Sequence, residues 1–369
     1  MDKSRYLIAS LLLSCSTLGS EGEGDRNLPT AGVGPFRKLD GDELIGVPPF
    51  VFADSFANYR EPSVLSLSEK DPEVALYAVA LQRIAGSQRD VFVRSHASDG
   101  RSFYGSAGDS GHTPPIVLEP TLPWEAGQIA SPSVLGYKGE VWLYYATPAG
   151  IALATSSDGF TFKKRDNPIF VRDTSVAWEA DAPHAPSVAL FPDGKFHLFY
   201  GSGGAIGEAI SADGVTFERL DSDQATSAID PVLTPVSDIP ASQLPTGEKP
   251  PFDVIRVDHP CVVLRTTVAD RLHVRVLYTG YRNTDGVILS AIGFAARYGD
   301  RGKLVRNTAP VFSVGKHEEA PTFFSWQGGA FLYVHHDAGQ SNAPYPAVAG
   351  AFAPANEKLP KPLTFSTSP

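Results

Sequence analysis

The strongest constraint on the fold is a unit that occurs five times along the chain. Each copy begins with a proline, continues as an apolar strand, and returns through a tight turn as a second strand rich in aromatic residues. The prolines that begin the units are Pro62, Pro132, Pro186, Pro260 and Pro321. Units built only of short strands cannot bury their apolar faces alone, so we expect them to stack against one another.

A third strand follows in the central units and ends at an Asp-Gly turn. The stretches "SDGFTF" (157–162) and "ADGVTF" (212–217) share this form, and Asp99-Gly100 begins a similar turn. Asp-Gly supplies the positive φ that a tight hairpin needs, and the phenylalanine after it returns to the core. Each unit is therefore predicted to be a four-stranded antiparallel meander.

We predict an all-β fold, a five-bladed β-propeller of four-stranded antiparallel blades, over residues 47–369. The competing fold is one β-sandwich or two, but a sandwich does not predict the same unit five times. The fifth unit ends after "PAVAGAFAPA" without a clear Asp-Gly hairpin. We expect "PPFVFA", residues 48–53, to supply its missing outer strand and close the ring.

Composition narrows the classes of function. The chain has 31 prolines and 34 glycines but one methionine, which favours short strands and tight turns over helical bundles. Its 31 basic and 41 acidic residues give a formal charge of −10. Such a chain repels nucleic acid, so nucleic acid is excluded as a partner.

The N-terminus is predicted to be an export signal. Lys3 and Arg5 precede a short apolar run, and Leu12-Leu13-Ser14-Cys15 resembles a bacterial lipobox. That resemblance implies that residues 1–15 are a signal peptide ending in a lipobox cysteine, with Cys15 as the site of lipidation. The alternative is an ordinary secretory signal with an incidental cysteine.

The lipobox resemblance also implies a location. Residues 16–46, rich in Gly, Ser and acidic residues, suit a flexible tether. We expect the protein in a bacterial cell envelope, anchored by lipid to a membrane (the outer membrane is favoured), or secreted. Cys261 is the only other cysteine, so it cannot form an internal disulfide with a lipidated Cys15 and is expected to be a small buried residue.

The candidate site consists of the residues just before the repeat prolines. In a propeller the first strand of each blade lines the central channel, so these residues are expected to meet at its mouth. The ionisable ones are Arg60, Glu61, His184, Asp258, His259, Glu318 and Glu319, with Asp181 slightly upstream. Close carboxylates raise one another's pKa, which suits an acid paired with a base. The alternative is that they only bind water or an ion in a polar channel.

The five units, the acidic residues before their prolines and the Asp-Gly turns together resemble the arabinanase, levansucrase and invertase superfamily of propeller glycoside hydrolases. Glycoside hydrolase families 43 and 32 belong to that superfamily. The match at the catalytic steps is partial. Glu61-Pro62 stands where family 43 has Asp-Pro, Ser131-Pro132 lacks the second aspartate, and His184 replaces the third-blade acid. Glu319-Ala320-Pro321 has the expected Glu-small-Pro form but lies in the fifth unit.

The resemblance implies hydrolysis of a glycosidic bond in a poly- or oligosaccharide, which requires two carboxylates across a pocket. In this interpretation Glu61 is the base or nucleophile, Glu319 the general acid, and Asp258 a stabiliser of the transition state or a base. The residues expected to bind the sugar are Arg60, Asp181, His184, His259 and Glu318. A glycan-binding propeller without activity is the alternative, favoured by Ser131, and a purely structural envelope propeller is the third.

Three further patterns bear on the site. Sialidase Asp-boxes are excluded because "SSDGFTF" lacks the residue between Asp and Gly and ends in Phe. His335 and His336 are adjacent on a strand and point to opposite faces, so a shared metal is not expected. No cofactor is expected, a structural cation in the channel is left open, and the protein is expected to be a monomer that binds carbohydrate.

The stretch "WEADAPHAPSV" (178–188) separates scaffold from site. The preceding unit has Trp124 and Glu125 at the same spacing from its proline as Trp178 and Glu179 from Pro186. Residues that recur in this way are expected to be architectural. Asp181 and His184 have no counterpart in the preceding unit, so function is expected there.

Overall fold

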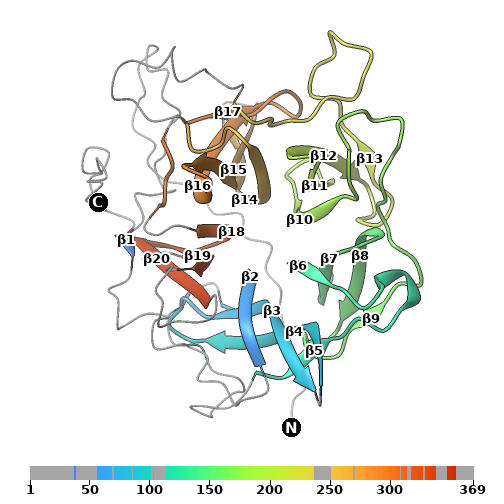
Figure 1. The fold of residues 1–369 in the computed structure, drawn as a ribbon, viewed down its shortest axis with the longest axis vertical. Helices are drawn as coiled ribbons and strands as arrows, with labels where there is room; N and C mark the ends of the chain where they lie inside the picture. The colour runs from blue at the N-terminus through green and yellow to red at the C-terminus, as the bar shows by residue number, and fades with distance from the viewer. Residues whose placement is uncertain are drawn as a thin grey trace.

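The fold is an all-β propeller of four-stranded antiparallel blades. The computed structural model describes residues 37–38, 56–68, 70–84, 86–100, 103, 114–236, 251–268, 271–307, 309–313, 317–326, 329–337 and 347–354. Within these ranges the strands form five sheets of four strands each, placed around a common centre (Figure 1). The predicted meander of four strands is therefore confirmed.

The sheets are numbered here in the order of their innermost strands. The innermost strands of sheets 1 to 5 are β2 (Phe56–Ser66), β6 (Ala130–Tyr137), β10 (His184–Leu190), β14 (Arg256–Val268) and β18 (His317–Trp326). The second strands are β3 (Val74–Ile84), β7 (Glu140–Thr147), β11 (Phe196–Ser202), β15 (Arg271–Thr284) and β19 (Gly329–Asp337).

The two outer strands of each sheet are shorter on average. The third strands are β4 (Ser87–Ala97), β8 (Gly150–Ser156), β12 (Ala205–Ser211), β16 (Val287–Tyr298) and β20 (Ala347–Pro354). The outermost strands are β5 (Ile116–Leu118), β9 (Lys163–Lys164), β13 (Glu218–Arg219), β17 (Val305–Arg306) and, for sheet 5, β1 (Arg37–Lys38).

Sheet 5 is completed by the N-terminal part of the chain, as expected, but by a different segment. Arg37 pairs with Phe352 and Lys38 with Ala351. The prediction that residues 48–53 supply this strand is wrong, and those residues lie outside the described ranges. The two residues of β1 also belong to the segment 16–46 that we expected to be a tether.

The core is divided among the junctions between sheets. Five apolar clusters are present, and each lies between two neighbouring sheets, including sheets 5 and 1. At the last of these junctions Phe103 packs edge-on against Tyr333 with ring centres 5.6 Å apart. No helix among the described residues is long and apolar enough to cross a membrane.

Tyrosines on the second strands bond to the Asp-Gly turn of the next sheet. The hydroxyl of Tyr77 donates to the carbonyl of Gly159 at 2.9 Å, and Tyr144 donates to Gly214 at 2.9 Å. Tyr333 makes the same bond to Gly100 at 2.7 Å, which joins sheet 5 to sheet 1. The Asp-Gly turns thus have a second role, because their glycine carbonyls accept a hydrogen bond that joins them to the neighbouring sheet.

Hydroxyls after the repeat prolines form a second set of links nearer the centre. Ser63, Ser133 and Ser187 each accept a hydrogen bond of 3.0 to 3.1 Å from a backbone N–H of the next sheet. Cys261 has the equivalent place in sheet 4, and its sulfur accepts from the N–H of Phe323. Burial raises the pKa of Cys261 to about 12, although this bond opposes the rise. The thiol is therefore a structural acceptor and stays protonated.

Replacing Gly159 with alanine should destabilise the protein by about 1–3 kcal/mol. Gly159 has a φ of +73°, and an added Cβ would lie 2.7 Å from the Tyr77 hydroxyl. Gly139→Ala is the matched control, because its φ is +83° but nothing lies within 4 Å of the added Cβ. Urea unfolding should show the larger loss for Gly159→Ala; equal losses would mean that the tyrosine contact adds nothing to backbone strain.

Candidate active site

Each of the five units begins with a proline and the residue before it, and these five residue pairs meet at the centre of the propeller. Each innermost strand has a register irregularity at its proline. The residue before each proline has a positive φ, namely Glu61 (52°), Ser131 (48°), Ala185 (46°), His259 (46°) and Ala320 (49°). These five residues and the five prolines line one pocket of about 30 Å³. Of the ionisable residues expected at the mouth, Glu61 and His259 line this pocket, which has room for one or two water molecules.

Glu61 is the acidic side chain that lines this pocket. Its Oε2 accepts a hydrogen bond of 2.5 Å from the N–H of Ser131 and one of 3.1 Å from the Ser131 hydroxyl. Arg60 approaches the other oxygen at 3.6 Å but makes its closer ion pair, 2.6 Å, with Asp90 on β4. Ser131, which stands where the resembling family has an aspartate, therefore orients the carboxylate of Glu61.

Asp258 is buried between two histidines. Its Oδ2 lies 3.1 Å from Nε2 of His184, and its Oδ1 accepts from the N–H of His259 at 2.7 Å. Burial alone would raise the pKa of Asp258, but the charge of His259 and the hydrogen bond and charge of His184 hold it below its ordinary range. Asp258 is therefore ionised and already occupied by donors.

His184 carries a proton on both ring nitrogens. Nδ1 lies 3.0 Å from the carbonyl of Ala182, while Nε2 faces the Asp258 carboxylate. Neither acceptor has a hydrogen to give, so both nitrogens must donate. Burial alone would lower the pKa of His184, but the hydrogen bond and charge of Asp258 outweigh it and raise the pKa to about 9. A cation thus stands where the resembling family has an acid.

Glu319 lies beside a histidine of the next strand. Its Oε1 accepts from the Ser290 hydroxyl at 3.2 Å, and Glu319 pairs with His335 across β18 and β19. Nε2 of His335 is buried and has no hydrogen-bond partner among the described residues. Burial lowers the pKa of His335, while the charges of Glu319 and Glu61 oppose this. His335 therefore interacts electrostatically with both carboxylates.

Asp258 and Glu319 also share a cation. Arg256 interacts electrostatically with both carboxylates, and its guanidinium lies 3.8 Å over the centre of the Tyr281 ring. Asp258 and Glu319 do not line the central pocket. Each directly precedes a residue that lines the pocket, His259 or Ala320. Arg256 connects Asp258 with Glu319, and His335 connects Glu319 with Glu61.

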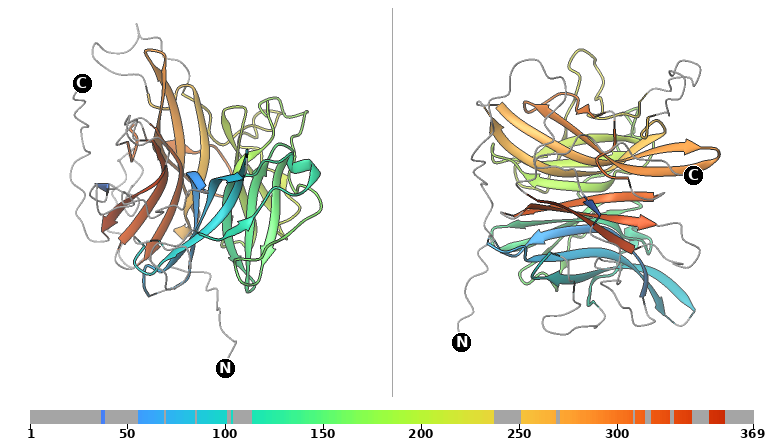
Figure 2. Two further views of the ribbon diagram at one scale, coloured as in Figure 1. Left: turned by 60° about the horizontal axis from the view of Figure 1, so that its bottom comes forward. Right: turned by 90° about the vertical axis from the view of Figure 1, so that its left-hand side faces the viewer.

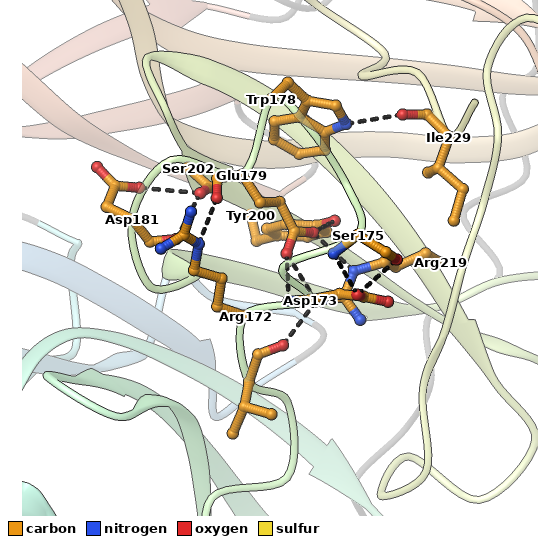
Figure 3. Close-up of polar contacts among 11 residues, drawn as sticks. Arg172, Asp173, Ser175, Trp178, Glu179, Asp181, Tyr200, Ser202, Arg219 and Ile229 are labelled. Atoms are coloured by element: carbon orange, nitrogen blue, oxygen red, sulfur yellow. Dashed lines mark hydrogen bonds and ion pairs between the residues drawn. The ribbon is translucent and has the colours of Figure 1, made fainter.

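The remaining predicted residues differ sharply in exposure. The side chain of Asp181 is 60% exposed. Its Oδ1 accepts from the Ser202 hydroxyl at 2.9 Å (Figure 3). The same oxygen accepts from the Gly203 N–H at 2.8 Å. Glu318, in contrast, is fully buried, so its carboxylate is not available to a ligand at the mouth. His259 lines the pocket.

Trp178 and Glu179 are architectural, as the repeat predicted (Figure 3). Fully buried Glu179 accepts from the Tyr200 hydroxyl at 2.7 Å and from Arg219 at 2.6 and 2.8 Å, which ties β11 to the outermost strand β13. Glu125 makes the same contacts with Tyr145 and Lys164 in sheet 2. The indole of Trp178 donates to the carbonyl of Ile229 at 3.0 Å.

Several residues of the site were not identified from the sequence. Asp253 forms the sheet 4 version of the buried acid cluster, with Tyr278 at 2.8 Å and Arg306 at 2.6 Å, but no tryptophan marks it. Arg256 and Ser290 also carried no signal. His335 was expected to be structural, and its pairing with Glu319 could have been inferred only from the register of β18 and β19.

Metal binding has little support in the described part of the chain. No group of three or more His, Cys, Asp or Glu side chains there is arranged to hold a metal ion. Two titratable groups near the mouth, His184 and Asp258, bond to each other. The arrangement can therefore transfer protons and bind hydroxyl groups with its own side chains.

Comparison with known proteins supports the fold. No protein-family profile and no curated protein matches the sequence. A candidate glycosidase from Bacteroides thetaiotaomicron superposes with a TM-score of 0.61 at 17% identity, over 87% of this chain and 97% of its own. A thermostable family-43 glycoside hydrolase superposes with a TM-score of 0.50 at 14% identity, over 82% and 91% of the two chains.

A third similar structure is described with the GH130 family of mannoside phosphorylases, which contains glycoside hydrolases that target β-1,2-mannosidic linkages in Candida mannan. It has a TM-score of 0.57 at 15% identity and covers 82% of this chain and 85% of its own. At such identities the likeness shows a shared fold. The fold resemblance inferred from the repeats therefore holds, and the chain has a propeller like those of glycoside hydrolases.

His184→Gln should reduce stability in a pH-dependent way. The folded-state pKa of about 9 exceeds the ordinary 6.5, so the contribution is fully present below pH 6.5 and is lost as pH rises through 9. The variant should be less stable than wild type by about 1–3 kcal/mol at pH 6 and nearly equal to it at pH 10. Urea unfolding across this range measures the difference, and a His184 imidazole that titrates near pH 6.5 by NMR would contradict the assignment.

Proposed function

We propose that the protein is a carbohydrate-active, five-bladed propeller that hydrolyses a glycosidic bond at the mouth of its channel. The observation that carries the proposal is the meeting of the five innermost strands at one pocket, with Glu61 in its lining and Glu319 directly before Ala320 of the same lining. Glycosidic cleavage needs one carboxyl group to protonate the leaving oxygen and another to attack carbon or activate water. The glycoside hydrolase descriptions of the similar structures support the same class of substrate.

The roles follow from the contacts of each side chain. Glu61 lies against the pocket and has one oxygen oriented by Ser131, so we assign it the base or nucleophile. Glu319 carries a single hydrogen bond from Ser290 and is assigned the general acid. Asp258 is occupied by His184 and His259, and its negative charge would stabilise positive charge that develops on the sugar ring.

Glycan binding without turnover is the second candidate. Two observations favour it: Asp258 already has both oxygens engaged, and Ser131 supplies a hydroxyl where the resembling family has an aspartate. In this alternative the same mouth binds the sugar without cleaving it. The two candidates share the ligand class and differ only in whether the bond is cleaved.

We further propose that the protein is a lipoprotein of a bacterial cell envelope. Residues 1–15 would be the signal peptide, and Cys15, released as the first residue, would carry the lipid. The tether after it would hold the propeller away from the membrane, where a polysaccharide can reach the channel.

Glu319→Gln and Glu61→Gln should each lower turnover by about 100-fold or more while glycan binding is retained, because each removes one proton-transfer or nucleophilic group. A panel of plant and fungal polysaccharides, assayed for both released sugar and binding, provides the measurement. Glu218→Gln, an exposed acid on β13, is the control and should behave as wild type. Binding without turnover by wild type would establish the second candidate.

Cys15→Ser should prevent lipidation and release the protein from the membrane fraction. Mass spectrometry of the mature N-terminus is expected to show diacylglycerol on Cys15 in wild type only. An unmodified wild-type Cys15, or cleavage at another position, would contradict the anchor and favour an ordinary secretory signal.

A further inference from the structure

The second-strand hairpins differ in height at the mouth of the channel. The residue two before each repeat proline gives a common reference, and the ladders show its partner on the second strand. In sheet 1 Arg60 pairs with Val79, and β3 continues for five more residues to Ile84. In sheet 4 Asp258 pairs with Thr279, and β15 continues for five more residues to Thr284.

Sheets 2 and 3 are much lower at this face. Ala130 pairs with Ala146 and His184 with Gly201, and in each case the second strand continues for one residue more. Four extra residues of strand correspond to about 14 Å. The β15–β16 hairpin extends beyond the rest of the ribbon in the right-hand view of Figure 2. The hairpins of sheets 1 and 4 therefore form two walls, with the low sheets 2 and 3 between them.

The low sector carries polar side chains that are fixed before any ligand binds. Both ring nitrogens of His184 are engaged, yet the side chain is 32% exposed. Asp181 is fixed by the sheet 3 hairpin through Ser202 and Gly203, and its second oxygen accepts no hydrogen bond from the described residues. Ala185 lines the pocket, and His184 and Asp181 precede it in the chain outside the pocket lining.

The carboxylate oxygen of Asp181 that remains open, held on a low polar surface, suits the hydroxyls of a sugar chain. A single sugar at the pocket would leave Asp181 without a role, whereas a longer chain would reach it. We propose that the ligand is an extended oligosaccharide that runs from the pocket over sheets 2 and 3, past His184 and Asp181, with the β15–β16 hairpin as one side wall. This inference rests on the proposed function and specifies where the rest of the substrate lies.

The test measures affinity against chain length by calorimetry, with manno- and arabino-oligosaccharides of one to six units. The full-length wild-type chain should bind the longest member of the preferred series roughly tenfold more tightly than the shortest, because added units contact Asp181. Asp181→Asn should lose most of this gain and leave the affinity for the shortest ligand unchanged. Asp71→Asn, an exposed acid in the β2–β3 loop at the opposite end, is the matched control.

A second variant tests the wall. Deleting Asn283, Thr284, Val287 and Ile288 removes two residue pairs and places the Asp285-Gly286 turn on Arg282 and Leu289, which already pair. It should also weaken the longest ligand selectively, with an unchanged melting temperature as the check on folding.

The results of these binding experiments distinguish a failure of the extended path from a failure of the proposed function. Wild-type affinity that does not grow with chain length, or Asp181→Asn behaving like Asp71→Asn, would overturn the extended path while binding of the shortest sugar upholds the proposed function. If no saccharide of either series binds or is cleaved, the proposed function fails and this inference fails with it.

Discussion

The structure depends on a single backbone constraint that occurs once in each sheet. The residue before each repeat proline adopts a left-handed conformation, which residues with a side chain rarely do. The proline after it fixes its own φ and removes a donor, so the innermost strand is interrupted at that step. Five such interruptions around one axis make the pocket and place Glu61 and His259 in its lining.

Conformational strain at these positions is offset by contacts between sheets. The hydroxyls of Ser63, Ser133 and Ser187 bond to the next innermost strand just beyond each step. Farther out, tyrosine hydroxyls hold the Asp-Gly turns of the next sheet, and buried acids tie second strands to outermost strands. The site can thus hold strained residues and the His184–Asp258 ion pair because hydrogen bonds join neighbouring strands near the centre, in the middle and at the outside of the propeller.

The fold was predictable from the sequence because its determinants are local and repeated. Each proline, Asp-Gly turn and aromatic strand can be recognised without knowledge of the other copies. The comparison with Trp124-Glu125 likewise identified Trp178 and Glu179 as parts of the framework. The outer strand of sheet 5 was assigned to the wrong segment because two residues, Arg37 and Lys38, carry no pattern. Their pairing is set by the position of β20.

The site was predictable only as a set of residues. That the steps meet follows from the propeller, but which side chains pair depends on register and on neighbours in other sheets. No pattern in the sequence indicates that Asp258 pairs with His184, 74 positions away, or that Ser131 bonds to Glu61. Glu318 and Glu319 are adjacent and chemically alike, yet strand alternation buries the first and directs the second toward Ser290.

The pairing of β1 with β20 has a consequence for how the molecule folds. Sheets 1 to 4 consist of strands that are consecutive in the chain, so each can form from local contacts as a hairpin extends. Sheet 5 requires Arg37 to find Phe352, which closes a loop of more than 300 residues. Closure of so long a loop carries an entropic cost, so β1 should join β20 only after contacts between sheets 5 and 1, such as the bond from Tyr333 to Gly100, have brought the two ends of the ring together. Before those contacts form, the apolar faces of sheets 1 and 5 are exposed, and an open chain of this kind is prone to aggregate.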